Sequence, residues 1–131
     1  MDTHDRFGLT HMADAWAQGL SGGQQKLLTL AMLAISDAPL IILDEPAAGV
    51  NPSMINKLVD HVLALNAEGK TIVVVEQNLS FIERVAPRVL VIVAGEKLCE
   101  GSMAEIRDTS EVQRAYVGSM AVPVAKRTEV A

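Results

Sequence analysis

The stretch LSGGQ, residues 20–24, combines residue types that can hold an anion. Its two consecutive glycines lack Cβ atoms, so the backbone can approach a ligand closely. A predicted helix follows at once, and the first N–H groups of a helix have no partners within it and carry the positive end of its dipole. Because Ser21 adds a hydroxyl donor, the stretch predicts a phosphate-binding turn. The alternative is a plain loop in which the serine caps the helix.

A second stretch, LIILDEP at residues 40–46, ends an apolar run with two acids. At the end of a strand, Asp44 could hold a hydrated Mg²⁺ ion. Glu45 could orient an attacking water molecule and remove its proton. The alternative is a pair of acids that caps the turn after the strand, and neither stretch decides the matter alone.

Helices and strands that alternate along the chain must position these residues. The apolar pattern predicts a buried helix over 24–35, a buried strand over 40–43, a helix over 52–67, a second buried strand over 71–78 and a short helix over 79–86. Asn51 is the expected N-cap of the third of these elements, with Pro52 in its first turn. This alternation predicts an α/β fold with a partly parallel sheet flanked by helices. Ligands of such folds lie at the carboxyl ends of the strands, where the acids and Gln77 are found.

The carboxyl-terminal third predicts different elements. Residues 88–102 are typical of a hairpin that turns at Gly95. Ser102, followed three residues later by Glu105, is the pattern of a capping box. A last short helix is expected over 110–118 and a loose tail over 119–131.

Composition excludes several classes of protein. The chain has 131 residues and a net charge of −5, without a basic stripe, which argues against general DNA or RNA binding. Its one cysteine, Cys99, allows no internal disulfide and is expected to be a small packed side chain. No run of about 18 uncharged apolar residues occurs, so membrane association would need a partner.

The two stretches together are far more specific than either alone. The run LSGGQQ to LIILDEPAAGVNP resembles the ATP-binding cassette (ABC) ATPases, in which LSGGQ is the signature motif and the strand with Asp-Glu is Walker B. AAGVNP, residues 47–52, matches the D-loop of that family. The resemblance extends to about residue 118 and implies the carboxyl-terminal part of a P-loop NTPase domain.

The resemblance also implies roles for single residues, with ATP and Mg²⁺ as cofactors. Asp44 would hold the metal ion and Glu45 would be the general base. Gln77 stands where most members have a histidine that contacts the γ-phosphate; its amide can donate a hydrogen bond but cannot become cationic. Asn51 stands where many members have aspartate. The residues implied to contact nucleotide bound by a second subunit are Leu20, Ser21, Gly22, Gly23 and Gln24, together with Asn51.

The stretches DEPAAGVNP, VVVEQN and VQRAYVG are similar to the ATPase subunits of branched-chain amino acid importers. This likeness implies a second ABC ATPase subunit and membrane permease subunits as partners, and no nucleic acid. It implies a peripheral location on the cytoplasmic face of the inner membrane. A cassette used in DNA repair or translation is a weaker alternative, because such proteins usually carry insertions or tandem cassettes.

One family motif is missing from the 131 residues: there is no G-x-x-x-x-G-K-[ST] loop, which wraps the phosphates of ATP. We therefore expect residues 1–19 to end a helical subdomain, 20–118 to form the later part of the ATPase core and 119–131 to be a tail. Such a fragment would be inactive unless complemented, and it would expose a sheet edge and apolar faces. The alternative is a non-catalytic remnant that acts only as a partner module.

Two further side chains carry expectations. Trp16 precedes the signature and is expected to pack within the helical subdomain. His61 lies in the middle of a predicted helix without a metal-ligand partner one turn on, and it is expected to be solvated.

Overall fold

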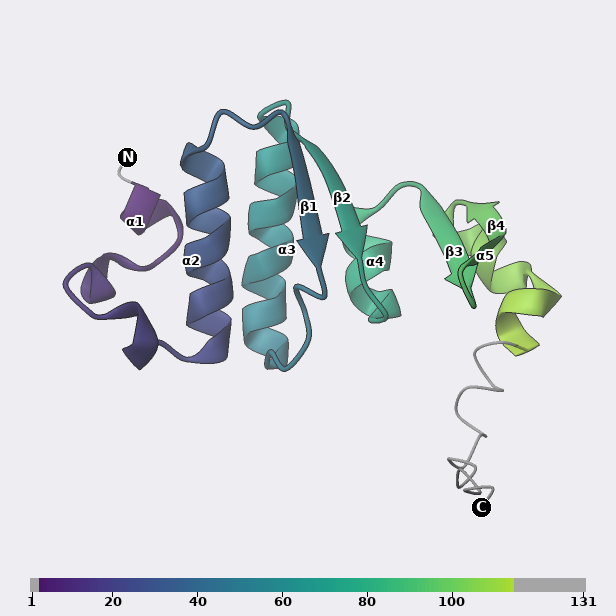
Figure 1. Cartoon of the computed structure of the whole chain (residues 1–131), viewed down its shortest axis with the longest axis horizontal. Coiled ribbons are helices and arrows are strands. Elements are labelled where there is room, and N and C mark those ends of the chain that lie inside the picture. Colours follow the sequence, from purple (N-terminus) through teal and green to yellow (C-terminus); the bar gives the residue numbers. More distant parts are fainter. Residues whose placement is uncertain (1–2, 115–131) are drawn as a thin grey trace, which may run out of the picture. The chain divides into compact units, whose positions relative to one another are not determined.

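The parallel strand pair predicted by the sequence is present in the computed structural model, which describes residues 3–114 and divides the chain between Ala86 and Pro87 into two compact units (Figure 1). The helices of the first unit are α1 (Thr3–Arg6), α2 (Gly22–Ile35), α3 (Pro52–Ala67) and α4 (Leu79–Val85), and its strands are β1 (Leu40–Asp44) and β2 (Thr71–Val75). Two short 3₁₀ turns, Thr10–Met12 and Ala17–Gly19, lie between α1 and α2.

Strands β1 and β2 pair in parallel, in a register that runs from Leu40 opposite Thr71 to Asp44 opposite Val75. One further bond continues the ladder, from the N–H of Glu45 to the carbonyl of Val75 at 2.8 Å. Helices α2 and α3 stand beside the strands in Figure 1 and contact each other. The carboxyl ends of both strands therefore meet at one edge, as a parallel α/β arrangement requires.

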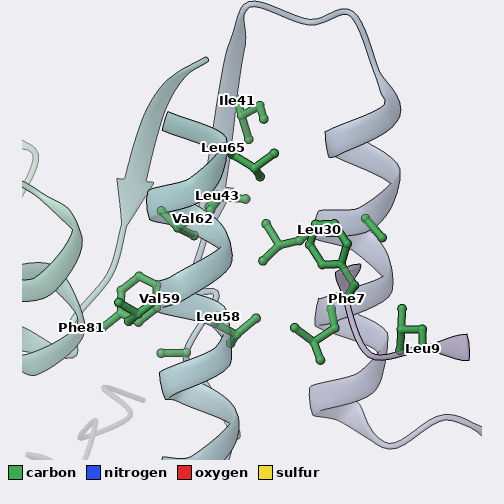
Figure 2. Packing of buried hydrophobic residues seen from close by; sticks show 13 residues of the cluster. Phe7, Leu9, Leu30, Ile41, Leu43, Leu58, Val59, Val62, Leu65 and Phe81 are labelled. Atoms are coloured by element: carbon green, nitrogen blue, oxygen red, sulfur yellow. The ribbon is translucent and has the colours of Figure 1, made fainter. Parts of the chain in front are cut away.

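Helix α3 is the centre of the core, and its ends follow from local chemistry. The Asn51 side chain accepts a hydrogen bond from the N–H of Met54, and Pro52 occupies the first helical position. After the helix, Gly69 takes a φ of +94°, which favours glycine. The fully buried face consists of Leu58, Val59, Val62 and Leu65, and Figure 2 shows them among the side chains from β1 and α2. The predicted cap, start and end of this helix are confirmed.

The prediction of strands buried on both faces is wrong. Ile41 and Leu43 join the core, whereas the opposite face exposes apolar side chains. The members of this exposed sheet face are Leu40, Ile42, Val73 and Val75. Among residues 3–86 no helix or strand buries this face, so alternation along each strand leaves every second side chain in solvent.

Helix α2 is also less buried than predicted. It buries Gly23, Leu27, Leu30 and Ala31 and exposes 65% of Met32 and 67% of Ile35. One side of α2 faces α3 and the core and another part contacts α1, whereas Met32 and Ile35 lie outside these contacts with the core.

Two single-residue expectations are corrected as well. Trp16 does not pack in a subdomain, because 88% of its surface is exposed just before the 3₁₀ turn Ala17–Gly19. His61 is half-buried rather than solvated, because its ring stacks on the buried Phe7 with ring centroids 4.2 Å apart. The amino-terminal segment thus folds back onto α3 through this ring pair.

The setting of His61 predicts acid sensitivity. Burial lowers the pKa of His61 below its ordinary value of 6.5, Arg6 and Lys57 lower it further by repulsion, and Asp60 opposes them. From pH 6.5 down to the folded-state pKa the unfolded chain binds the proton more readily, so the stabilising effect of neutral His61 is present above 6.5 and is lost as the pH falls through this window.

We expect the free energy of unfolding, measured with urea between about pH 7.5 and about pH 5, to fall less steeply with acid in His61→Gln than in the unchanged chain. The two proteins differ only at residue 61, so the difference between the two curves isolates His61. Parallel curves would contradict the prediction.

The second unit contains the predicted hairpin, β3 (Val89–Val93) and β4 (Glu96–Gly101), paired antiparallel. Its turn residues Ala94 and Gly95 have φ values of +51° and +84°, the left-handed pair that a two-residue hairpin turn needs. Helix α5 (Met103–Asp108) follows, and the predicted capping box between Ser102 and Glu105 is formed.

Two predictions fall wholly or partly beyond the described residues. Residues 110–114 are helical, as expected, whereas the rest of the helix predicted to Gly118 and the tail over 119–131 lie outside the described residues.

Cys99 is a half-buried free thiol on β4. No helix among residues 3–114 is long and apolar enough to cross a bilayer.

Candidate functional site

Three predicted site residues meet where β1 and β2 end. Asp44 is the last residue of β1, Glu45 follows it, and both are exposed. The side-chain amide nitrogen of Gln77, two residues after β2, donates to Oε1 of Glu45 at 3.4 Å. The structure therefore brings the predicted metal ligand, general base and phosphate contact to one edge of the sheet.

The backbone of Glu45 is fixed from two sides. Its φ of +46° lies in the left-handed region, which is uncommon for a residue other than glycine. Its N–H donates to the Val75 carbonyl at 2.8 Å, and its own carbonyl accepts from Nζ of Lys26 on α2 at 2.5 Å. Strand β2 and helix α2 thus hold the conformation from which the carboxylate projects.

The donors at this edge suit Mg²⁺ in the way a nucleotide-bound ion is usually held. Mg²⁺ keeps several water molecules and takes one or two carboxylates together with substrate phosphates. The exposed carboxylate of Asp44 supplies such an oxygen, and within residues 3–114 no cluster of three or more His, Cys, Asp or Glu residues forms an all-protein metal cage. A cavity of about 260 Å³, lined by Asp44, Lys26 and Pro46 among others, adjoins it between α2 and β1.

The LSGGQ stretch forms the start of α2. Ser21 is the N-cap: its Oγ accepts from the N–H of Gln24 at 3.4 Å, and its own N–H donates to Oε1 of Gln24 at 2.8 Å. This capping box bears out the alternative that the serine caps a helix, and it uses the N–H groups of Ser21 and Gln24. Leu20 is half-buried before it, and Gly22 is exposed.

The two glycines of the stretch differ in their surroundings. A Cβ on Gly22 would meet nothing within 4 Å, whereas a Cβ on the buried Gly23 would lie 2.8 Å from Cγ of Met54 in the first turn of α3. Gly23 therefore allows the starts of α2 and α3 to approach closely, a packing role that the sequence did not reveal.

We expect Gly23→Ala to lower the free energy of unfolding by about 1–3 kcal/mol, because Met54 must shift. Gly22→Ala should raise it by about 0.5–1 kcal/mol, since the unfolded chain loses freedom and no clash arises. Urea unfolding measures both. In a Met54→Ala background the cost of Gly23→Ala should vanish; a cost that persists there would contradict the contact as its cause.

Asn51 lies beside this packing contact. Its Oδ1 accepts from the N–H of Met54 at 2.9 Å and from the Ser53 hydroxyl at 2.8 Å, so it acts as the N-cap of α3. The site residues therefore form two groups: the strand-end group of Asp44, Glu45 and Gln77, and the helix-start group of residues 20–24 and Asn51. Lys26 connects them, because it lies on α2 and binds the Glu45 carbonyl.

Glu76 was not predicted as a site residue, although it lies at the centre of the strand-end group. Its carboxylate accepts from three backbone N–H groups, those of Ala47 at 2.7 Å, Gln77 at 2.8 Å and Asn78 at 2.9 Å. The only signal for it in the sequence is its place at the end of the apolar run VVV, where it precedes two amide residues.

Comparisons with known proteins find similar chains. The family model described as ABC transporter matches residues 2–48. The probable branched-chain amino acid transport ATP-binding protein LivG of Archaeoglobus fulgidus is 35% identical over 111 residues, covering 85% of this chain and 43% of the relative. The Nod factor export ATP-binding protein I of Cupriavidus metallidurans is 33% identical over 131 residues, covering 93% of this chain and 43% of the relative.

Solved structures show the same fold. The ADP conformation of MJ1267, an ATP-binding cassette of an ABC transporter, superposes with a TM-score of 0.79 at 29% identity, covering 88% of this chain and 47% of that one. A nucleotide-free ATP-binding cassette from an ABC transporter gives 0.80 at 28% identity, with 87% and 47% covered. The chain spans less than half the length of these relatives. Motif order, sequence likeness and fold agree: the chain is similar to the ATP-binding proteins of ABC transporters and has the fold of their ATPase domain.

Proposed function

We propose that this chain is part of the ATP-hydrolysing subunit of an ABC transporter that imports branched-chain amino acids or related small solutes. The observation that carries the proposal is the strand-end group, in which the carboxylate of Glu45 lies next to Asp44 and within reach of the Gln77 amide. Relatives named for branched-chain amino acid transport from A. fulgidus and Escherichia coli, at 35% and 32% identity, support the choice of cargo.

In this proposal each residue of the strand-end group has one role. Asp44 binds Mg²⁺, which when bound with the nucleotide neutralises charge on the phosphate oxygens. Glu45 accepts a proton from the attacking water, and its fixed backbone aims the carboxylate. Gln77 donates a hydrogen bond to the γ-phosphate through its amide nitrogen, which lies beside the Glu45 carboxylate.

The helix-start group would act on a second subunit. The start of α2, from Leu20 through Ser21 to Gln24, would face a nucleotide held by a partner ATPase subunit, and the N–H of the exposed Gly22 suits one of its phosphates. Asn51 would lie at the same contact as part of the D-loop. Membrane permease subunits would be the further partners, with this chain peripheral on the cytoplasmic face of the inner membrane.

A second candidate function is a non-catalytic partner module, which uses only the helix-start group. The observation that favours it is the absence of a G-x-x-x-x-G-K-[ST] loop from the 131 residues. Under both proposals the chain alone would hydrolyse little ATP, because nothing in that sequence wraps the phosphates. The two differ in which residues the activity needs.

Two mixtures separate the candidates. In the first, this chain is mixed with a polypeptide from a related cassette that supplies the phosphate-binding loop; Mg²⁺-dependent ATP hydrolysis that requires Glu45 supports the catalytic subunit. In the second, the chain is mixed with a complete related cassette. If the chain raises the rate of ATP hydrolysis by that cassette, and if this effect requires Ser21 but survives Glu45→Gln, the partner module is supported. No activity above that of the added polypeptides in either mixture would contradict both.

A further inference from the structure

Glu76 joins two loops that are far apart in the sequence. It directly follows β2 and is half-buried. Oε2 accepts from the N–H groups of Gln77 and Asn78 at 2.8 and 2.9 Å, which belong to its own loop. Oε1 accepts at 2.7 Å from the N–H of Ala47, which lies 29 residues earlier in the loop after β1. One carboxylate therefore binds three N–H groups on both sides of the strand-end group.

The bond to Ala47 replaces the next step of the backbone ladder. The last ladder bond runs from the N–H of Glu45 to the carbonyl of Val75. In a parallel pair the next donor is two residues further on, at Ala47, because every second residue faces the neighbouring strand. Here the side chain of Glu76 accepts a hydrogen bond from that N–H, so the loops that follow β1 and β2 remain joined after the strands have ended.

The three hydrogen bonds that the Glu76 carboxylate accepts, which we call the tie, flank the two side chains that the proposed function needs. Ala47 is two residues after Glu45, and Gln77 directly follows Glu76. The backbone is therefore fixed on both sides of the hydrogen bond between Gln77 Nε2 and Glu45 Oε1. A change in the tie would move one of the two side chains relative to the other, although the Glu76 carboxylate accepts only from backbone N–H groups and from neither side chain.

We propose that Glu76 is a positioning residue that holds Glu45 and Gln77 at working distance by binding the backbone N–H groups of Ala47, Gln77 and Asn78. The inference rests on the proposed function of ATP hydrolysis for its consequence, but its structural part does not. The carboxylate is the required chemistry, because both of its oxygens accept and together they face three donors. An amide of the same shape has one oxygen and one NH₂ group, so one side of the tie would set donor against donor.

The first test is amide hydrogen exchange in the full 131-residue chain. In the unchanged protein the amide of Ala47 should be protected from exchange. Glu76→Gln should speed exchange at Ala47, or at Gln77 and Asn78, about tenfold or more, since each loses a hydrogen bond to a charged acceptor. Amides inside β1 and β2 report global unfolding, so a change confined to the loops is local.

The matched control is Glu68→Gln. It removes one carboxylate charge from the residue that caps the far end of α3 and pairs with Arg6, without touching the loops. It should leave exchange at Ala47 unchanged. An Ala47 amide that is unprotected in the unchanged chain would overturn the proposal, and this outcome needs no variant to fold. So would exchange at Ala47 that is as fast in Glu68→Gln as in Glu76→Gln.

The second test is the rate of ATP hydrolysis in the mixture that supplies the phosphate-binding loop. Glu76→Gln should lower kcat about tenfold or more and leave the KM for ATP within about twofold, because the loops position reacting groups rather than bind the nucleotide. Altered exchange with unchanged kcat would overturn the positioning role. If the unchanged mixture hydrolyses no ATP, the proposed function fails, while the exchange test still decides whether Glu76 ties the loops.

Discussion

Replacing Glu45 by Gln should lower the rate of ATP hydrolysis by about two to four orders of magnitude, because the amide cannot take a proton from the attacking water. The substitution keeps the shape of the side chain and an oxygen that can accept from Gln77, so the fold should be unchanged. Mg-ATP should still bind, since Asp44 and the phosphate contacts remain. Single-turnover hydrolysis in the mixture that supplies the phosphate-binding loop gives the rate, and filter retention of labelled nucleotide gives the binding.

Glu68→Gln is again the matched control, because it loses the same charge in the same unit at the opposite end of α3. Its turnover should equal that of the unchanged chain. If Glu45→Gln retains full turnover, Glu45 is not the general base and the role assigned to the strand-end group is wrong.

Among the substitutions that we propose, truncation of Phe81 should lower the free energy of unfolding the most. Of the residues of α4 only Phe81 is buried, with none of its surface exposed, and it belongs to the core cluster that contains Val59 of α3 (Figure 2). Phe81→Ala should lower the free energy of unfolding by about 3–5 kcal/mol through lost burial and the cavity left behind. Urea unfolding followed by far-UV circular dichroism measures it.

The effect should reach the site, because α4 begins at Leu79, directly after Gln77 and Asn78. Phe81→Leu should lose less stability, since it leaves a smaller cavity. Trp16→Ala is the control for removing an aromatic ring: with 88% of its surface exposed, it should change stability by no more than about 0.5 kcal/mol. Equal losses at Phe81 and Trp16 would contradict the buried position of α4.

Features set by neighbouring residues in the sequence could be predicted, and these predictions are confirmed. The cap at Asn51, the turn at Gly95 and the capping box at Ser102 depend on residues at most three positions away. Burial is different, because an apolar side chain does not specify what will cover it. Ile42 and Met32 fit a core by residue type, yet both are exposed.

The strand-end group was predictable for a topological reason. Parallel strands bring their carboxyl ends to one edge, so Glu45 and Gln77 were expected to meet there. Lys26 and Glu76 were not predicted, because both bind backbone atoms, a carbonyl and three N–H groups. Such contacts depend on the path of the chain and carry no pattern of paired side chains.

If Glu45 is the proposed general base, its left-handed backbone sets stability and activity against each other at a single residue. A non-glycine residue in that conformation costs the fold on the order of 1 kcal/mol, which glycine would recover. Selection for a more durable fold alone would therefore favour glycine at this position, whereas selection for turnover would retain the carboxylate. Directed evolution of this chain for heat resistance, without a screen for ATP hydrolysis, should enrich variants that have lost Glu45.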